Sequence, residues 1–152
     1  MLGFLTDGKR VIKLDKRYDH HYDFLQKELD MDVASLFYLC FLIGYTTGSK
    51  KENYIPGRKQ FRTSYLSEEQ RAVLYTISEE ISDYKLLKNL TDQEIIGVII
   101  KDFQLYSSKG MEILLEEVFS KQLTNDQLNH SYKNYEFDLM CYLYDRLSSV
   151  PF

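Results

Sequence analysis

The 152-residue sequence contains few of the residues that mark disordered, fibrous or disulfide-rich chains. It has two prolines, seven glycines and no tryptophan, while 44% of its residues are hydrophobic, so linker-like and collagen-like chains are excluded. The two cysteines, Cys40 and Cys141, each lie among apolar residues and far from one another in the sequence. This pattern predicts two buried, reduced thiols rather than a disulfide.

A long apolar run is also missing. The longest candidate, residues 33–45, is well short of the ~20 residues that span a bilayer. The N-terminal residues show no secretory signal pattern, because Asp7 and Gly8 interrupt their few apolar residues. We therefore expect a soluble, cytoplasmic protein with no membrane partner.

Motifs typical of catalysis, nucleotide binding or metal binding are absent as well. The sequence has no CxxC, HExxH, GxSxG or EF-hand spacing, and the glycines of residues 44–50 are wrongly spaced for a phosphate-binding loop. His20 and His21 are adjacent, so on a helix their side chains leave the axis about 100° apart, and His130 lies far along the chain. We therefore expect no metal, no cofactor and no enzymatic activity.

Apolar residues at helical spacing dominate what is present. They predict an all-α, single-domain bundle of five to six helices over residues 1–152, built around a buried central helix at about residues 33–47. That helix is apolar on nearly every side, with Asp32 suited to its N-cap and Gly48 suited to a left-handed end. Residues 1–14 suit either a short extended segment or a docking arm.

The other helices are expected before and after this one in the sequence. Ser67–Gln70 and Thr91–Glu94 both match the capping-box pattern, and Ser107–Gly110 is expected to separate two helices. Leu86, Leu87 and Leu90 are expected to bridge the third and fourth helices, and residues 122–133 are expected to form a polar loop. The expected ranges are 18–29, 67–84, 91–106, 111–121 and 134–147, the last with an apolar stripe of Phe137, Met140, Cys141, Tyr144 and Leu147.

Charge is distributed unevenly along this chain of net charge −4. Residues 48–62 carry five Lys or Arg and one Glu, whereas residues 63–152 carry eight basic and fifteen acidic residues. We predict that this basic segment binds a partner or an anion, through Lys50, Lys51, Tyr54, Arg58, Lys59 and Arg62. An acidic protein surface and single-stranded nucleic acid both suit this mixture, and a solvated loop paired with the chain's own acidic helices accounts for it equally well.

Several segments resemble a family of small accessory proteins that are encoded beside bacterial DNA phosphorothioation gene clusters and in related phage-defence islands. The resemblance covers about two thirds of the chain and includes the apolar helix, its ending at Gly44, Tyr45 and Gly48, the basic turn, Arg62 and the glycine-led segment 110–118. It implies a non-enzymatic subunit of an antiviral defence complex that works beside an ATPase or a nuclease.

Two functional hypotheses follow. The first is an adaptor that contacts one or more larger protein subunits of a prokaryotic defence complex through residues 49–65 and exposed tyrosines, of which the chain has thirteen. The alternative is a nucleic-acid-binding sensor module that uses the same basic and aromatic segment. The acidic remainder of the chain favours the adaptor, because a nucleic-acid-binding domain is usually basic over a whole face.

Overall fold

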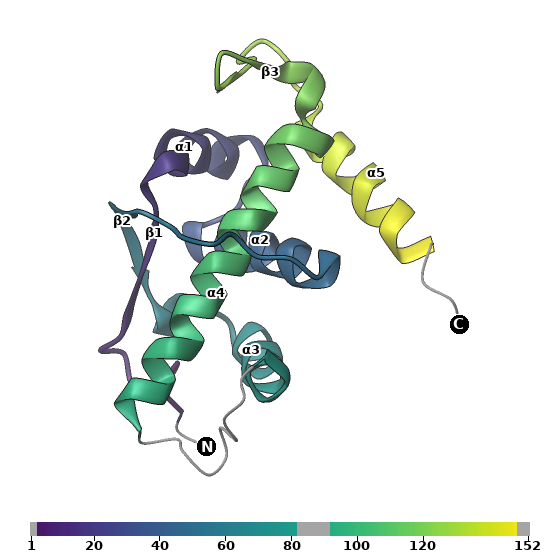
Figure 1. The fold of residues 1–152 in the computed structure, drawn as a ribbon. Helices are drawn as coiled ribbons and strands as arrows, with labels where there is room; N and C mark the ends of the chain where they lie inside the picture. Colours follow the sequence, from purple (N-terminus) through teal and green to yellow (C-terminus); the bar gives the residue numbers. More distant parts are fainter. Residues whose placement is uncertain (1–2, 82–91, 149–152) are drawn as a thin grey trace.

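A computed structural model describes residues 3–81 and 92–148 of the chain. These residues form five α-helices and two antiparallel two-stranded sheets, with the long helix α4 running through the middle of the fold (Figure 1). The structure is mostly helical, so the predicted all-α class is right for most of the chain and wrong for the residues that form the sheets. Within the described residues no single helix is long and apolar enough to cross a membrane, whereas the bent pair Lys16–Glu28 and Val33–Thr47 meets both criteria when counted together.

The predicted central helix is confirmed as α2 (Val33–Thr47). Asp32 caps its first turn by accepting a hydrogen bond of 2.7 Å from the amide of Ser35. Gly48 ends it in the left-handed conformation with φ 77°, which a residue without a Cβ adopts readily. Its core side chains include Phe37 and Phe41, both at most 1% exposed.

Helix α4 (Gln93–Ile113) is longer than the sequence predicts. It passes through residues 107–110 without a break and continues into the π-helical segment η4 (Leu114–Val118), so the expected separation into two helices is wrong. The small polar residues there serve packing instead of a turn, because the hydroxyl of Ser107 donates to the carbonyl of Phe37 at 3.0 Å. Asp92 caps the helix by accepting from two amides. Thr91, where the predicted capping box begins, lies outside the described residues.

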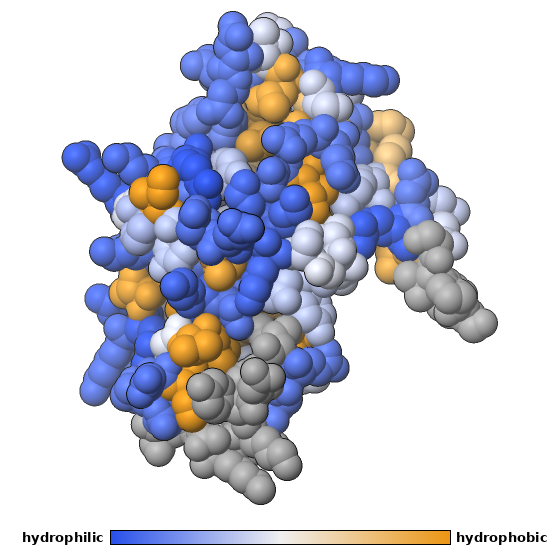
Figure 2. All heavy atoms as spheres, in the orientation of Figure 1, coloured by the Kyte–Doolittle hydropathy of each residue, from blue (hydrophilic) through white to orange (hydrophobic). Residues whose placement is uncertain are grey.

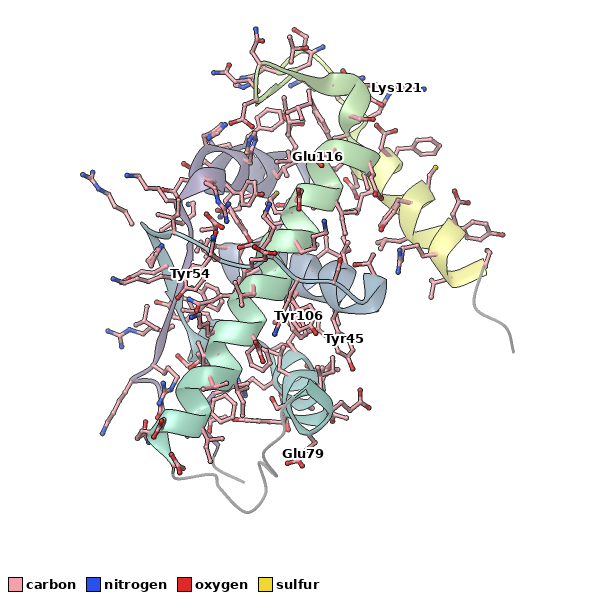
Figure 3. The ribbon with its side chains drawn as sticks, viewed as in Figure 1. Tyr45, Tyr54, Glu79, Tyr106, Glu116 and Lys121 are labelled. Carbon is pink, nitrogen blue, oxygen red and sulfur yellow. The ribbon has the colours of Figure 1, made fainter. Side chains whose placement is uncertain are left out.

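Glycines allow α2 and α4 to cross at very short range. A methyl group at Gly110 would overlap the backbone carbonyl of Cys40, and one at Gly44 would overlap the carbonyl of Tyr106. Tyr45 and Tyr106 lie beside this crossing with ring centroids 5.6 Å apart (Figure 3). The two helices therefore meet backbone to backbone, with aromatic rings closing the edge of the contact.

Strands β1 (Val11–Asp15) and β2 (Pro56–Arg62) form the main departure from the predicted bundle. They pair antiparallel, with Ile12 opposite Phe61, and both of these side chains are buried. Of residues 1–14, the structure thus places 11–14 in an extended segment, as one of the two predicted alternatives has it. The second half of the predicted basic loop is a strand, in which alternation places Phe61 in the core and exposes Arg58, Gln60 and Arg62.

Helices α1 (Asp19–Glu28) and α3 (Glu68–Ile81) match the predicted elements. The capping box before α3 is confirmed, since the Gln70 amide donates to the Ser67 hydroxyl at 3.1 Å and the Ser67 amide donates to the Gln70 side chain at 2.9 Å. The third helix was expected to reach Tyr84 and to be followed by a bridge of three leucines. These residues, Tyr84, Leu86, Leu87 and Leu90, lie outside the described residues.

The C-terminal part is a hairpin followed by a projecting helix. Strands β3 (Leu123–Thr124) and β4 (Gln127–Leu128) pair across Asn125 and Asp126, whose φ angles are 50° and 62°. The expected polar loop therefore contains a small sheet. Helix α5 (Tyr135–Ser148) confirms the last predicted helix and runs away from the other helices (Figure 1).

Candidate functional site

The predicted basic site divides into paired and unpaired cations. Lys50 contacts Asp102 at 2.7 Å, Lys51 contacts Glu112 at 3.3 Å and Lys59 contacts Asp23 at 2.5 Å. Three of the five cations therefore pair with acids of the chain itself. Tyr54 lies in the connection before β2 and is half-buried (Figure 3).

The ion pair between Lys51 and Glu112 is part of a larger cluster of charges within the chain. Burial alone would raise the pKa of Glu112, but hydrogen bonds from Lys109 and Lys51 outweigh that effect and lower the pKa. The carboxylate is thus stabilised in its charged form between two ammonium groups, at 3.1 Å from Lys109 and 3.3 Å from Lys51. Lys51 acts here as an internal counter-ion.

Arg58 and Arg62 are the members of the predicted site that remain available. Both are exposed on the solvent side of β2, and no ion pair joins either of them to a described acidic residue. On the neighbouring strand, Lys13 is also exposed and pairs in register with Gln60, which lies between the two arginines. The structure thus brings together a smaller positive strip on the sheet, separate from Lys50 and Lys51.

The apolar stripe that the sequence predicts for the last helix lies on α5, and most of it is exposed to solvent. Phe137 is 63% exposed, Met140 60%, Tyr144 70% and Leu147 69%. Their spacing of three and four residues places them on one side of the helix, and Figure 2 shows hydrophobic residues on this projecting arm at the right of the view. Cys141 is exposed as well, so the prediction that it is buried is wrong.

Acidic groups border this apolar face. Glu136 and Asp145 are exposed on α5 itself. Beside the helix, a cavity of about 370 Å³ separates α5 from the end of η4, and Glu117, Asp138 and Asp145 contribute to its lining together with Lys121. The sequence contains these acids, but the orientation of α5 that gathers them is set by its first turns, where Tyr135 and Leu139 are buried.

A second cavity, of about 550 Å³, is lined by all three histidines of the chain. His20 and His21 come from the first turn of α1, and His130 comes from the segment after β4 and stacks on Phe24 with centroids 4.6 Å apart. Sequence reasoning missed this cluster. The Asn125–Asp126 pair is a recognisable turn signal, but nothing local indicates that the hairpin lies against α1.

Asp126 lies beside the two adjacent histidines. The Nε2 atom of His21 is 3.1 Å from one carboxylate oxygen of Asp126, and the Nε2 atom of His20 is 3.7 Å from the other oxygen. Adjacent side chains leave the helix in different directions, but each imidazole ring lies two torsions beyond the backbone, and both rings turn towards Asp126. Burial lowers the pKa of His21, while the hydrogen bond to Asp126 opposes that shift.

Cys40, the other thiol, has the environment of a structural residue. It is fully buried beneath α4, and burial raises the pKa of its thiol to about 12. A thiol that stays protonated at neutral pH is a poor nucleophile.

Comparisons with known proteins add no relative. No family model, curated protein or solved structure matches this chain. Function is therefore inferred from three surfaces: the strip of Lys13, Arg58 and Arg62, the apolar face of α5, and the histidine cluster.

Proposed function

We propose that this chain is a non-enzymatic adaptor that binds a partner protein through the apolar face of α5. The observation that supports this most is the uncovered row of Phe137, Met140, Tyr144 and Leu147, each at least 60% exposed. Fully burying a side chain of this size contributes about 1.5–3 kcal/mol, so four of them on one helix face provide a strong driving force for association. Contiguous exposed apolar faces are typical of protein-binding sites.

The surrounding charge favours a partner with basic groups. Glu136 and Asp145 are exposed on α5, and Glu117 adds a third acid across the adjacent cavity. A second copy of α5 would bring like charges together, whereas a segment with apolar residues flanked by Lys or Arg would match both the stripe and its border. We therefore propose an amphipathic, basic helix of another protein as the occupant.

The resemblance to defence-island accessory proteins supplies the expected context. On that basis the partner is a larger subunit of a prokaryotic antiviral complex, such as an ATPase or a nuclease. The contact surface differs from the one that the sequence favours, because Lys50, Lys51 and Lys59 are engaged with acids of the chain itself. Arg58 and Arg62 then contribute at most a secondary contact.

Capture of the native complex tests the proposal. A tagged chain with Phe137→Ser and Tyr144→Ser should lose its stoichiometric partner, while a matched variant with Val73→Ser and Val98→Ser should retain it. The control residues are also apolar and exposed, at 37% and 45%, but they lie on α3 and α4. Equal capture by both variants would contradict the proposal, and sedimentation of the purified chain as a dimer that the α5 substitutions dissociate would identify a second copy as the occupant.

A nucleic-acid-binding sensor is the alternative, and the exposed strip of Lys13, Arg58 and Arg62 favours it. Binding through three cations to duplex should give a slope of about −2.7 in log affinity against log salt, at about 0.9 per phosphate. Fluorescence anisotropy at two salt concentrations, with Arg58→Glu and Arg62→Glu as the test variant, measures this. Undetectable binding at low salt would reject the alternative and leave the adaptor.

A further inference from the structure

The cluster at the start of α1 has the composition of a metal site. His20 and His21 each offer a ring nitrogen and Asp126 offers a carboxylate oxygen, and these three ligand atoms all lie within 4.8 Å of one another. Imidazole and carboxylate together suit divalent transition metals such as Zn²⁺. We propose that His20, His21 and Asp126 form a binding site for Zn²⁺ that joins α1 to the β3–β4 hairpin.

The donor atoms lie near the spacing of a tetrahedral ion. With bonds of about 2.0–2.1 Å to zinc, two ligands of a tetrahedral site lie about 3.3 Å apart. The Nε2 atom of His21 is 3.1 Å from Oδ1 of Asp126, and the Nε2 atom of His20 is 3.7 Å from Oδ2 and 3.0 Å from the backbone carbonyl oxygen of the same residue. Because a single carboxylate oxygen would be the ligand, the exposed side chains of His20 and Asp126 would rotate to bring the three donor atoms around one ion.

The backbone positions the three ligands from two sides. The two imidazole rings come from consecutive residues of α1, and their centroids are 3.8 Å apart. Asp126 sits at the tip of the hairpin with φ 62°, a conformation that Asp and Asn adopt more readily than most residues. Three protein ligands leave the fourth position of the ion to water, as in open zinc sites.

Access to the site is direct. The side chains of His20 and Asp126 are 53% and 70% exposed, while His21 is 1% exposed and anchors the cluster to the core. Both histidines also line the cavity of about 550 Å³, so an ion can enter without opening the fold.

Hydrogen bonds between the two imidazoles and Asp126 would hold a similar arrangement without an ion, so the experiment measures the ion itself. Chelator-treated protein is titrated with Zn²⁺ by calorimetry, and Co²⁺ is added separately to record the visible absorption of a tetrahedral centre. We expect one ion per chain, an absorption band typical of tetrahedral Co²⁺, and a higher Tm with Zn²⁺ than without it.

Two substitutions identify the ligands. Asp126→Asn removes the carboxylate and keeps a residue that tolerates the positive φ, and His20→Gln removes an exposed imidazole; circular dichroism checks that both variants fold. Loss of a hydrogen-bond partner of a metal ligand typically weakens metal binding by about 10–100-fold. Because each substitution removes a ligand itself, each should weaken Zn²⁺ binding by at least that factor.

His130→Gln is the matched control, because His130 lines the same cavity without belonging to the ligand cluster. The Zn²⁺ affinity of this variant should equal that of the unaltered chain. Absence of Zn²⁺ binding, unchanged affinity in the Asp126→Asn and His20→Gln variants, or an equal loss in His130→Gln would each overturn the proposed site. None of these outcomes depends on partner binding by α5.

Discussion

Helices α2 and α5 are similar in length, at 15 and 14 residues, and both carry aromatic and aliphatic residues at helical spacing. Their surroundings differ. In α2, Phe37 and Phe41 are at most 1% exposed, whereas in α5 Phe137 and Tyr144 are 63% and 70% exposed. One helix is covered by the chain that contains it, and no described element covers the apolar face of the other.

The difference shows what helical periodicity encodes. An apolar stripe predicts that a face is to be buried, and it does not specify whether the covering surface belongs to the same chain. For α2 the covering surface is internal, because Gly110 and Ser107 allow α4 to approach. For α5 the covering surface proposed above is external and basic, to match the acidic border at Glu136 and Asp145.

The largest expected effect contrasts one phenylalanine from each helix. Phe41→Ala removes a fully buried ring from α2 and should reduce the free energy of unfolding by about 3–5 kcal/mol. Phe137→Ala removes an exposed ring from α5 and should change it by no more than about 0.5 kcal/mol. Urea denaturation measures both, and a loss of several kcal/mol in the Phe137 variant would mean that α5 is part of the folded core.

A second contrast lies within α4. Gly110→Ala places a methyl group against the backbone carbonyl of Cys40, which cannot move aside as a flexible side chain could, so a loss of about 3 kcal/mol is expected. Gly97→Ala lies on the same helix with no atom of a described residue within 4 Å of the added Cβ and should gain about 0.5–1 kcal/mol. Denaturation of the two variants in parallel separates close packing from helix propensity, and equal stabilities would contradict the backbone contact at the crossing.

These contrasts also explain which features could be read from the sequence. The ends of α2 and the capping box before α3 depend on residues within four positions of one another, so local patterns predicted them. The pairing of β1 with β2 joins Ile12 to Phe61, and the approach of His21 to Asp126 spans 105 positions. Such contacts depend on the arrangement of whole elements, and a single sequence contains no local signal for them.

The continuous α4 illustrates the same limit in another form. Ser107 to Gly110 has the composition of a turn, and in isolation that composition favours a break. Packing overrides it, because the hydroxyl of Ser108 donates to Asp15 at 3.0 Å and that of Ser107 reaches Phe37. The positive charge of residues 48–62 can be counted in the sequence. Which of its lysines are paired cannot, because their partners Asp102, Glu112 and Asp23 are distant in the sequence.

A third prediction concerns the buried charge beside α4. Asp15 is 4% exposed and accepts hydrogen bonds from Arg17 and from Ser108. Burial alone would raise the pKa of Asp15, but the hydrogen bonds and charge of Arg17 outweigh it and lower the pKa. Asp15→Asn should therefore reduce the free energy of unfolding by about 1–3 kcal/mol at pH 7.

The pH dependence of that effect has a defined sign. Because the pKa of Asp15 is lower in the folded chain, its stabilising contribution is present above the unfolded value of about 3.9 and is lost as the pH falls through the folded value. The difference between Asp15→Asn and the unaltered chain should shrink when urea denaturation is repeated near pH 3. The effect of Phe137→Ala, which involves no titrating group, should stay constant; a constant difference for Asp15→Asn would show that its charge is not involved.

The smallest expected effect tests whether Lys50, in the basic segment 48–62, is held as firmly as the covered helix α2 or is as accessible as the exposed face of α5. Lys50 is 43% exposed and its ion pair with Asp102 is partly open to solvent, so Lys50→Ala should lower the free energy of unfolding by about 0.2–1 kcal/mol, and less at 1 M salt. Arg62→Ala, which breaks no ion pair with a described acid, should have a smaller effect under the same conditions. A loss above about 2 kcal/mol that persists in high salt would place Lys50 with the packed α2–α4 crossing, where Tyr106 lies 5.6 Å from its ammonium group. A small, salt-sensitive loss would instead mean that the cation is held by a surface pair, which a sufficiently acidic partner could displace.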